Sequence, residues 1–572
     1  MKPPLRPLLQ PRRLPAALCA LAGAALPGAT CNHSVDVCVY GATPAGITAA
    51  IAAQEEGASV LLVEPGRWVG GMFGAGIKIT QDCPEPRAIG GLTKARVFSF
   101  ARKKPPETPA GLRANFKKWL ADERIPVVYE RRVVSAEKSG GALVSARFEG
   151  SPPDALGVPP PQTTPDDADV VFAKVFIDAS YEGDLMKLAG VSYAIGREAA
   201  STYGEKPAGV NPAASLGREA VAGQAGSSMA TDNWAPIDPC IVPGDPSSGL
   251  LPHVEADHGK PPGSADDYTQ AYNFRFYVTS DPARRADFGK PADYDPAQYE
   301  LAGRFVEYLK ATCKGRELGA RLEWIFPGWR NREDYNYHRR SLVTIAPLGV
   351  SRFYQDGDWA TRSAIWQQHI DYLAGLRYFL MTDPRTPPRY REKITALGLD
   401  KTIYPDTQGW PQQLYVRIAR RMSGRYVVTH KDVLNQTSPE DGIGLALYGV
   451  DTYPARRHAA TRNGRPGVVT EGNMFLGGAK GTSVPYPIPY RAITPVRDEC
   501  ANLLVPVCFS ASYIAYASAR MEPVFSVLGE SAGVAAAISI REKKPVQDID
   551  VPALQARLRE RGQILEWRHE RP

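Results

Sequence analysis

The chain has 572 residues, of which 43% are hydrophobic, 9% aromatic and 23% charged. These fractions are typical of a globular protein and exclude a disordered, fibrous or multi-span membrane chain. The formal net charge is +7, but about four of these charges lie in the first 30 residues, and the remainder is too small for a nucleic-acid-binding surface.

The first 30 residues have the layout of an export signal. Four basic residues, the last two adjacent at Arg12 and Arg13, precede an apolar run, and small residues follow before Cys31. The run is too short for a membrane span, so we predict residues 1–30 to be an export signal. The protein is therefore expected to be periplasmic or secreted, with twin-arginine export and general secretion as open alternatives.

A βαβ unit follows directly. Residues 35–40 are apolar enough for a buried strand, residues 47–56 form a helix of small side chains, and residues 58–63 form a second strand. A glycine-containing turn, 41–46, joins the first strand to the helix, and Glu64 ends the second strand. This order predicts a doubly wound parallel sheet in an α/β fold.

The turn of this unit is typical of a dinucleotide site. Gly41 permits the tight turn and Gly46 close helix–strand packing, while Thr43 stands where a middle glycine is usual. The positive end of the helix attracts a pyrophosphate, and an acid about 20 residues later, here Glu64, binds a ribose hydroxyl. We therefore predict that a dinucleotide binds at this turn.

Three later segments favour FAD over NAD. Glycines at 70–71 follow the acid, residues 178–180 end a later strand, and Gly529 is predicted to open a helix whose positive end faces the flavin. Residues 33–200 and 401–545 are thus expected to form a discontinuous FAD domain around a mixed α+β substrate or cap domain, 201–400. Residues 546–572 are expected to form a surface helix and tail.

The cysteines do not suggest a metal site, because none has a CxxC or Cys/His spacing. Cys500 and Cys508 are close enough in sequence for a disulfide, with two buried free thiols as the alternative. FAD is expected to be non-covalent; Cys83 is the first thiol to test if it is covalent.

Several segments together resemble one family. They are GATPAGITAAIAA, EPGRWVGGM, AIGGL, FIDASYEGDLMKLAGVSYAIGREA, YNFRFYVT, GWPQQLYVRIARRM, VPYPIPYRAIT and LLVPVCFSASYIAYASARMEPVFSVLGESAGVAAA. The set is similar to the FAD-dependent oxidoreductases of the glutathione-reductase-like class, some of which are labelled xanthan-lyase-related. The likeness runs from about residue 35 to residue 541, with a middle third that matches only in patches.

This resemblance implies the positions of the cofactor contacts. Glu64 would bind the adenosine ribose, the segment from Arg67 would run along the pyrophosphate, and Arg520 would lie at the isoalloxazine, where it can stabilise negative charge. The implied cofactor contacts are Gly41, Thr43, Pro44, Ala45, Gly46, Glu64, Arg67, Gly70, Gly71, Met72, Asp178, Ala179, Ser180, Met521, Gly529 and Gly533.

Two tyrosines depart from the family pattern. Tyr453 and Tyr513 stand where the family often has histidines, the usual base for an alcohol proton. With an ordinary pKa of ~10, tyrosine is a poor base at neutral pH. Tyr453, Tyr513 and Arg520 are the candidate catalytic residues, with packed aromatics as the alternative for the tyrosines and an ion pair to Glu522 for Arg520.

Four arginines, Arg275, Arg417, Arg420 and Arg421, suggest an anionic or polyhydroxylated ligand. Arg417, Arg420 and Arg421 have helical spacing, for which a solvated basic face is the simpler interpretation. Glu198 is expected to make a structural salt bridge, with substrate binding as the alternative.

The expected function is hydride transfer between a small organic, sugar-like substrate and flavin N5, with an unidentified electron acceptor. A lyase-related protein with structural FAD and a non-catalytic FAD-binding protein are the alternatives.

Overall fold

The computed structural model describes residues 30–101, 107–211, 234–327, 335–476 and 482–567. The predicted export signal lies outside these residues except for residue 30, and so does the end of the predicted tail.

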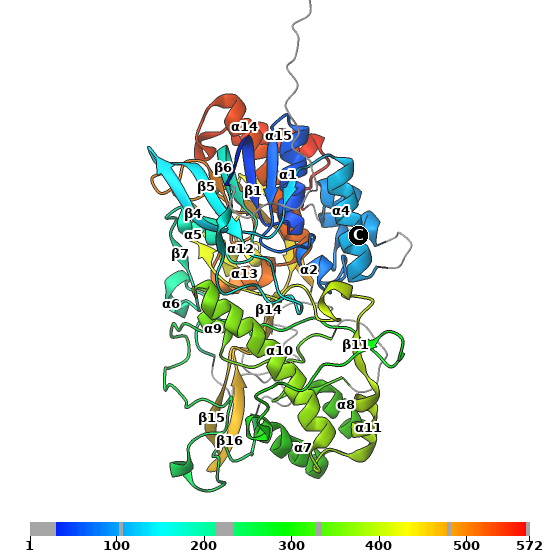
Figure 1. The fold of residues 1–572 in the computed structure, drawn as a ribbon. Helices are drawn as coiled ribbons and strands as arrows, with labels where there is room; N and C mark the ends of the chain where they lie inside the picture. The colour runs from blue at the N-terminus through cyan, green and yellow to red at the C-terminus, as the bar shows by residue number, and fades with distance from the viewer. Residues whose placement is uncertain (1–29, 102–106, 212–233, 328–334, 477–481, 568–572) are drawn as a thin grey trace, which may run out of the picture.

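A seven-stranded sheet lies in the upper part of the molecule (Figure 1). In space its strands follow the order β3-β2-β1-β6-β5-β4, and β19 also pairs with β6. The pairs β3–β2, β2–β1, β1–β6 and β6–β19 are parallel, whereas β4 and β5 form an antiparallel hairpin at one edge. The predicted α/β fold with a parallel sheet is therefore confirmed. The strands are β1 (Cys31–Tyr40), β2 (Val60–Val63), β3 (Val127–Val128), β4 (Arg131–Ser139), β5 (Ala142–Gly150), β6 (Thr164–Asp178) and β19 (Leu503–Leu504).

The core of this part is built on both faces of β1. Val37 and Val39 face the cluster that includes helices α1 (Pro44–Glu55) and α14 (Glu522–Glu542). Cys38 and Tyr40 point to the opposite face, where Tyr40 packs on Phe148 with ring centroids 5.6 Å apart. This alternation is the period of two expected of a strand that is covered on both sides.

Helix α14 starts earlier than its sequence pattern predicts. It begins at Glu522, not at Gly529, because Pro523 is well placed in a first turn and the apolar residues that follow it are buried. Among the described residues it is the one helix long and apolar enough to cross a membrane, yet 94% of its most apolar window is buried inside the protein. It is therefore a core helix of this fold.

The lower part of Figure 1 holds most of the middle segment. Its longest helix is α10 (Trp359–Thr382), and α7 (Glu300–Thr312) also lies here. The hairpin of β15 (Arg456–Arg462) and β16 (Arg465–Glu471) also lies here, and β16 pairs with β8 (Trp234–Ala235). Strands from the two sides of residue 400 thus share one sheet, and the proposed domain boundaries stay a prediction.

The remaining elements are short or peripheral. They are α2 (Gly71–Gly74), α3 (Phe98–Phe100), α4 (Pro109–Asp122), α5 (Asp184–Leu188), α6 (Ala200–Tyr203), α8 (Gly315–Ile325), α9 (Ser351–Tyr354), α11 (Pro388–Ala396), α12 (His430–Val433), α13 (Tyr513–Ala519), α15 (Val551–Glu560), β7 (Tyr193–Ala194), β9 (Val278–Thr279), β10 (Arg285–Ala286), β11 (Gly398–Asp400), β12 (Arg421–Met422), β13 (Gly442–Tyr448), β14 (Val450–Thr452), β17 (Met474–Leu476) and β18 (Thr482–Pro489).

The possible disulfide is not formed. Cys500 and Cys508 are both buried free thiols. Cys508 instead lies against the backbone carbonyl oxygens of Ser180 and Tyr181.

Candidate cofactor and substrate site

The turn between β1 and α1 has the backbone geometry that a pyrophosphate cradle needs. Gly41 has φ +96°, and a Cβ there would lie 2.9 Å from the backbone nitrogen of Ser180. A Cβ at Gly46 would overlap the carbonyl oxygen of Gly41, so neither position accepts a side chain. Thr43 replaces the middle glycine usefully, because its hydroxyl caps α1 at Gly46 N and donates to the carbonyl of Ala179 at 2.8 Å.

Glu64 is held at the end of β2 by two backbone donors. Ala42 N donates to its Oε2 at 2.7 Å and Gly66 N to its Oε1 at 2.8 Å. Burial raises the pKa of Glu64 to about 7 despite these donors. The carboxylate is therefore fixed in one orientation before any ligand arrives.

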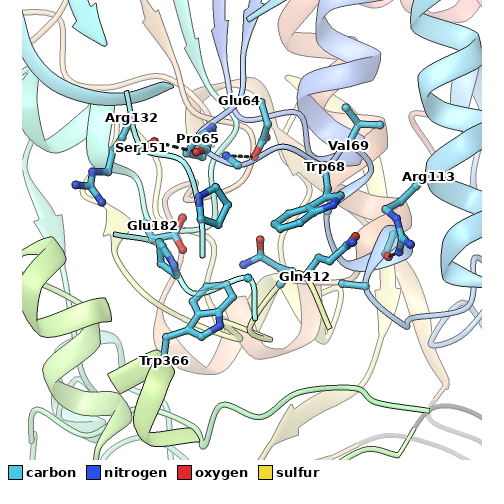
Figure 2. A pocket seen from close by; sticks show the side chains of 18 of the residues that line it. Glu64, Pro65, Trp68, Val69, Arg113, Arg132, Ser151, Glu182, Trp366 and Gln412 are labelled. Carbon is cyan, nitrogen blue, oxygen red and sulfur yellow. Dashed lines mark hydrogen bonds between the residues drawn. The ribbon is translucent and has the colours of Figure 1, made fainter. Parts of the chain in front are cut away.

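A cavity opens beside Glu64, between the sheet and the lower part of the molecule (Figure 2). Trp68 and Trp366 provide aromatic walls, and Gln412 also lines the cavity. Both amide atoms of Gln412 are buried and make no hydrogen bond among the residues described. A buried amide left unpaired in this way is suited to a polar ligand edge. The lining residues are Glu64, Pro65, Gly66, Trp68, Val69, Gly71, Gly74, Ala75, Arg113, Arg132, Ser151, Pro153, Gly157, Pro159, Glu182, Trp359, Trp366, Gln412 and Gln413.

The turn after β6 braces the first glycine turn. Asp178 accepts hydrogen bonds from Ser180 N, Ser180 Oγ and Met186 N, and burial raises its pKa to about 6. Ala179 supplies the carbonyl that Thr43 binds. Residues 178–180 therefore lie against the glycine turn, as the strand order requires.

A chain of contacts leads from this turn into the interior. A Cβ at Gly71 would overlap the hydroxyl of Tyr181 and lie 3.0 Å from Pro44 Cδ. Met72 N donates to that hydroxyl at 2.9 Å, and the hydroxyl donates to Glu522 Oε1 at 2.7 Å. Burial raises the pKa of Glu522 to about 8. Tyr181 was not singled out from the sequence, and Glu522 was considered only as an ion-pair partner of Arg520.

Arg520 and Tyr453 come together in a buried polar cluster. Arg520 donates to Tyr415 Oη at 3.0 Å and to Asp451 O at 2.9 Å. Gln270 Oε1 accepts from Arg520 Nη2 at 3.3 Å and from Tyr453 N at 3.1 Å. Arg520 makes no ion pair with Glu522 among the described residues; its nearest carboxylate oxygen is that of Asp451, at 3.7 Å.

Asp82 belongs to the same region and was also missed. It has φ +56°, which is uncommon for a residue with a side chain. Burial and the nearby Asp451 raise the pKa of its carboxyl, against the opposing effect of Arg275 and Arg520. No motif surrounds Asp82 in the sequence, so this position could not be predicted.

Tyr513 lies in a different environment from Tyr453. Its backbone N donates to Glu198 Oε2 at 3.0 Å, and its ring centroid lies 5.7 Å from Arg421 Cζ. Glu198 forms an ion pair with Arg421, which confirms the expected structural salt bridge. The structure therefore does not bring Tyr513 to the cluster of Arg520.

The two glycines of α14 pack against α1 and do not mark a helix end. A Cβ at Gly529 would overlap the carbonyl of Ala45, and one at Gly533 would overlap that of Ala49. The residue before the helix, Met521, is buried and precedes the true N-terminus at Glu522. The prediction of a helix terminus at Gly529 is wrong, because the small residues there serve helix–helix contact.

Arg67 lies at the surface. Its Nε is 2.6 Å from Glu130 Oε1, and the side chain is 38% exposed. It is not among the lining residues of the cavity, unlike its neighbour Trp68.

The arginines of residues 417–421 do not form a solvated helical face. The segment before β12 is not helical, and Arg417, Arg420 and Arg421 are each at most 2% exposed. The helical spacing does not predict the structure here, because the segment is not a helix and each of the three guanidinium groups binds a different partner.

Among the described residues there is no group of three or more His, Cys, Asp or Glu arranged to hold a metal ion. Cys83 is buried, which raises the pKa of its thiol to about 12 and keeps it protonated.

Comparison with known proteins gives a family match. The sequence pattern of a family described as FAD dependent oxidoreductase matches residues 36–558. No curated protein matches the chain.

Solved structures share only part of the chain. A flavoprotein/dehydrogenase from Cytophaga hutchinsonii is 18% identical, with 28% of this chain and 42% of that chain covered and a TM-score of 0.20. A 3-ketosteroid-delta4-(5alpha)-dehydrogenase from Rhodococcus jostii RHA1 is 13% identical, with 27% and 48% covered and a TM-score of 0.18. This chain spans less than half the length of either protein.

Proposed function

The chain belongs to the FAD dependent oxidoreductase family, and from this premise we propose that it transfers a hydride equivalent between a small organic substrate and FAD. The cofactor of this family is FAD, and the residues present fit it. The two glycines let the turn pack directly on the backbone of residues 179–180, and Glu64 and the unpaired amide of Gln412 border the cavity beside it. Bound FAD supplies a two-electron acceptor that takes hydride at N5.

We assign the adenosine half to the fixed carboxylate of Glu64, whose two oxygens are already oriented by backbone donors. The pyrophosphate is assigned to the N-terminus of α1, where the helix dipole favours an anion. Residues 70–72 and Tyr181 continue from there toward Glu522. These groups bind and orient the cofactor without a covalent link.

The observation that carries the proposal is the buried cluster at the far end of these contacts. Arg520 is 3% exposed and is held by Tyr415, Gln270 and Asp451. A fixed guanidinium in a site closed to water stabilises negative charge that develops during the reaction. Tyr453 is fixed beside it by Gln270 and by Asn336, whose amide donates to the hydroxyl at 2.9 Å.

The substrate is proposed to be sugar-like and the electron acceptor a second small molecule or protein. Export to the periplasm or medium is part of the proposal and is supported by the basic and apolar pattern of residues 1–30. Export is tested by fractionating the cells and sequencing the N-terminus of the protein in each fraction. We expect processed protein in the periplasm or medium, and protein found only in the cytoplasm with Met1 intact would contradict export.

The first experiment is an absorption spectrum of the purified protein, before and after denaturation and filtration. We expect flavin bands near ~450 nm that pass the filter, and bleaching under anaerobic conditions with a suitable donor. Arg520→Met is expected to retain FAD but to slow bleaching by about 100-fold, since one charge-stabilising donor contributes that much. Arg377→Met, which removes a buried arginine of the lower part, is the control. A colourless protein, or an Arg520→Met variant with unchanged bleaching, would contradict the proposal.

A further inference from the structure

Arg417 is a buried cation that has no carboxylate partner among the residues that the structure describes. It is 2% exposed, and its guanidinium lies between two tyrosine rings, 3.8 Å from the centroid of Tyr453 and 4.3 Å from that of Tyr415. Its terminal nitrogens donate to uncharged oxygens, those of Ala271 O, Asn273 Oδ1 and Asn336 Oδ1. Its Nε is buried and has no hydrogen-bond partner among the described residues.

The cluster around Arg417 has more positive than negative charge. Four guanidinium groups, those of Arg275, Arg339, Arg417 and Arg520, lie over the rings of Tyr415 or Tyr453. Among the described residues, Asp451 is the carboxylate at ion-pair distance from the last three; it pairs with Arg339 and lies 3.7 Å from Arg520. Asp82 acts on Arg520 from farther away. The Nε of Arg520, like that of Arg417, is buried and unpaired within the described structure.

A buried charge without a counter-charge is costly, and the cost is largest where the protein supplies only neutral acceptors. Burial lowers the pKa of Arg417 to about 10, which shows that its charge is poorly compensated, although it stays protonated at neutral pH. The two rings fix the plane of the guanidinium, so its free Nε–H edge has a set direction before a ligand arrives.

We propose that this cluster recognises the substrate through a carboxylate group, which Arg417 receives on its unpaired Nε edge beside Arg520. The inference rests on the proposed function, because it takes the molecule bound here to be the hydride donor. A sugar acid or another small hydroxy acid has both the carboxylate that Arg417 would bind and a C–H bond beside a hydroxyl that can donate hydride.

The excess of positive charge favours an anion. Asp451 pairs with Arg339 and lies near Arg520, which leaves Arg417 without a carboxylate partner among the described residues, and a planar carboxylate matches a guanidinium edge. The second unpaired donor, on Arg520, remains for the negative charge that FAD would acquire with the hydride. In that step the substrate C–H bond would break with its electron pair going to FAD, the hydroxyl proton would go to solvent, and the hydroxy acid would leave as a keto acid.

The experiment measures binding to the FAD-loaded protein without requiring turnover. Glucuronate is compared with glucose, and lactate with lactamide, by perturbation of the flavin spectrum and by calorimetry. We expect the acid of each pair to bind at least 100-fold more tightly than its neutral partner. Equal binding of acid and neutral partner, or no binding of either acid, would overturn the inference even if no variant folds.

Two variants locate the effect. Arg417→Met removes the charge and is expected to abolish the preference for the acid, whereas Arg417→Lys keeps the charge but lacks the planar edge and is expected to weaken acid binding about tenfold. Arg377→Met is the matched control because it removes a buried arginine that binds Asp287 and Leu397 O and not the residues of the cluster. Retained preference in Arg417→Met would overturn the assignment to Arg417.

The two proposals fail in different ways. Acids that bind through Arg417 while no donor bleaches the flavin would overturn the proposed function alone. Bleaching by neutral donors that acids neither compete with nor slow would overturn the carboxylate inference alone.

Discussion

At the scale of single residues, the site depends on side chains whose position is fixed before a ligand arrives. Glu64 shows this most directly, since Ala42 N and Gly66 N occupy one lone pair on each of its oxygens. The remaining lone pairs are free for ribose hydroxyls. Thr43 shows it in another way. Its hydroxyl bonds both Gly46 N in α1 and the carbonyl of Ala179 in the turn after β6, so it fixes the first turn at the position where a middle glycine is usual.

Glu64 gives the first prediction at this scale. Its pKa of about 7 lies above the ordinary value of 4.5, so the folded protein takes up a proton at this carboxyl as the pH falls below 7. An ionised carboxylate accepts stronger hydrogen bonds than a protonated one. FAD should therefore dissociate more readily as the pH falls from 8 to 6, and Glu64→Gln should weaken FAD binding by roughly tenfold or more at pH 8.

Equilibrium dialysis of FAD between pH 6 and 8 measures this effect. Glu182 lines the same cavity and its pKa is also raised by burial to about 7, so Glu182→Gln is the necessary control. We expect the pH step to survive in Glu182→Gln and to vanish in Glu64→Gln. The reverse pattern would assign the step to Glu182.

At the scale of elements, the contact between α1 and α14 carries the first glycine turn. Gly529 and Gly533 let α14 approach the backbone of α1 at Ala45 and Ala49, within one to two turns of the pyrophosphate cradle. A small-residue helix is visible in the sequence, but its partner is not, because helix–helix contact depends on distant chain segments. This is why the βαβ unit was predictable and the role of Gly529 was not.

Gly529→Ala therefore tests the contact. The added methyl would overlap the Ala45 carbonyl, which is backbone and cannot turn away, so we expect a loss of about 3 kcal/mol in the free energy of unfolding. FAD binding should weaken as well, since α1 must move. Gly464→Ala is the comparison: a Cβ there meets nothing within 4 Å, and its φ of +73° should cost only about 1 kcal/mol. Urea unfolding measures both, and equal losses would argue against the close contact.

The segment around Arg417 shows where local patterns mislead. Its basic residues have helical spacing, yet the chain is extended and each guanidinium ends on a different buried partner. Arg417 meets neutral oxygens, Arg420 meets Asp184, and Arg421 meets Glu198. Spacing along the chain cannot reveal partners that lie hundreds of residues away in sequence. The βαβ half of the candidate site could therefore be predicted from residue patterns, whereas in the interior half Arg520 and Tyr453 were named from the family resemblance and their partners Gln270 and Asp451 were not predicted.

At the scale of the whole molecule, buried ion pairs join the sheet to the lower part. Asp184 lies after β6. Its carboxylate accepts hydrogen bonds from Arg362 Nη1 of α10 at 2.8 Å and from Arg420 Nη1 at 2.7 Å. Burial alone would raise the pKa of Asp184, but these two arginines hold it below its usual range. Its contribution to stability is therefore present at neutral pH and is lost as the pH falls through that lowered value.

Arg362→Met tests whether this junction holds the two parts together. The substitution leaves Asp184 buried with one cation fewer, and breaking a buried pair from one side destabilises a protein by about 3 kcal/mol or more. Lys118→Ala removes an exposed ion pair with Asp122 and should cost less than about 1 kcal/mol. Urea unfolding at pH 7 compares the two variants. Because Arg362 acts through Asp184, the loss in Arg362→Met should shrink as the pH falls and Asp184 is protonated in both proteins. A loss that is independent of pH would mean that Arg362 stabilises α10 through its bonds to Tyr354 O and Gln355 O instead.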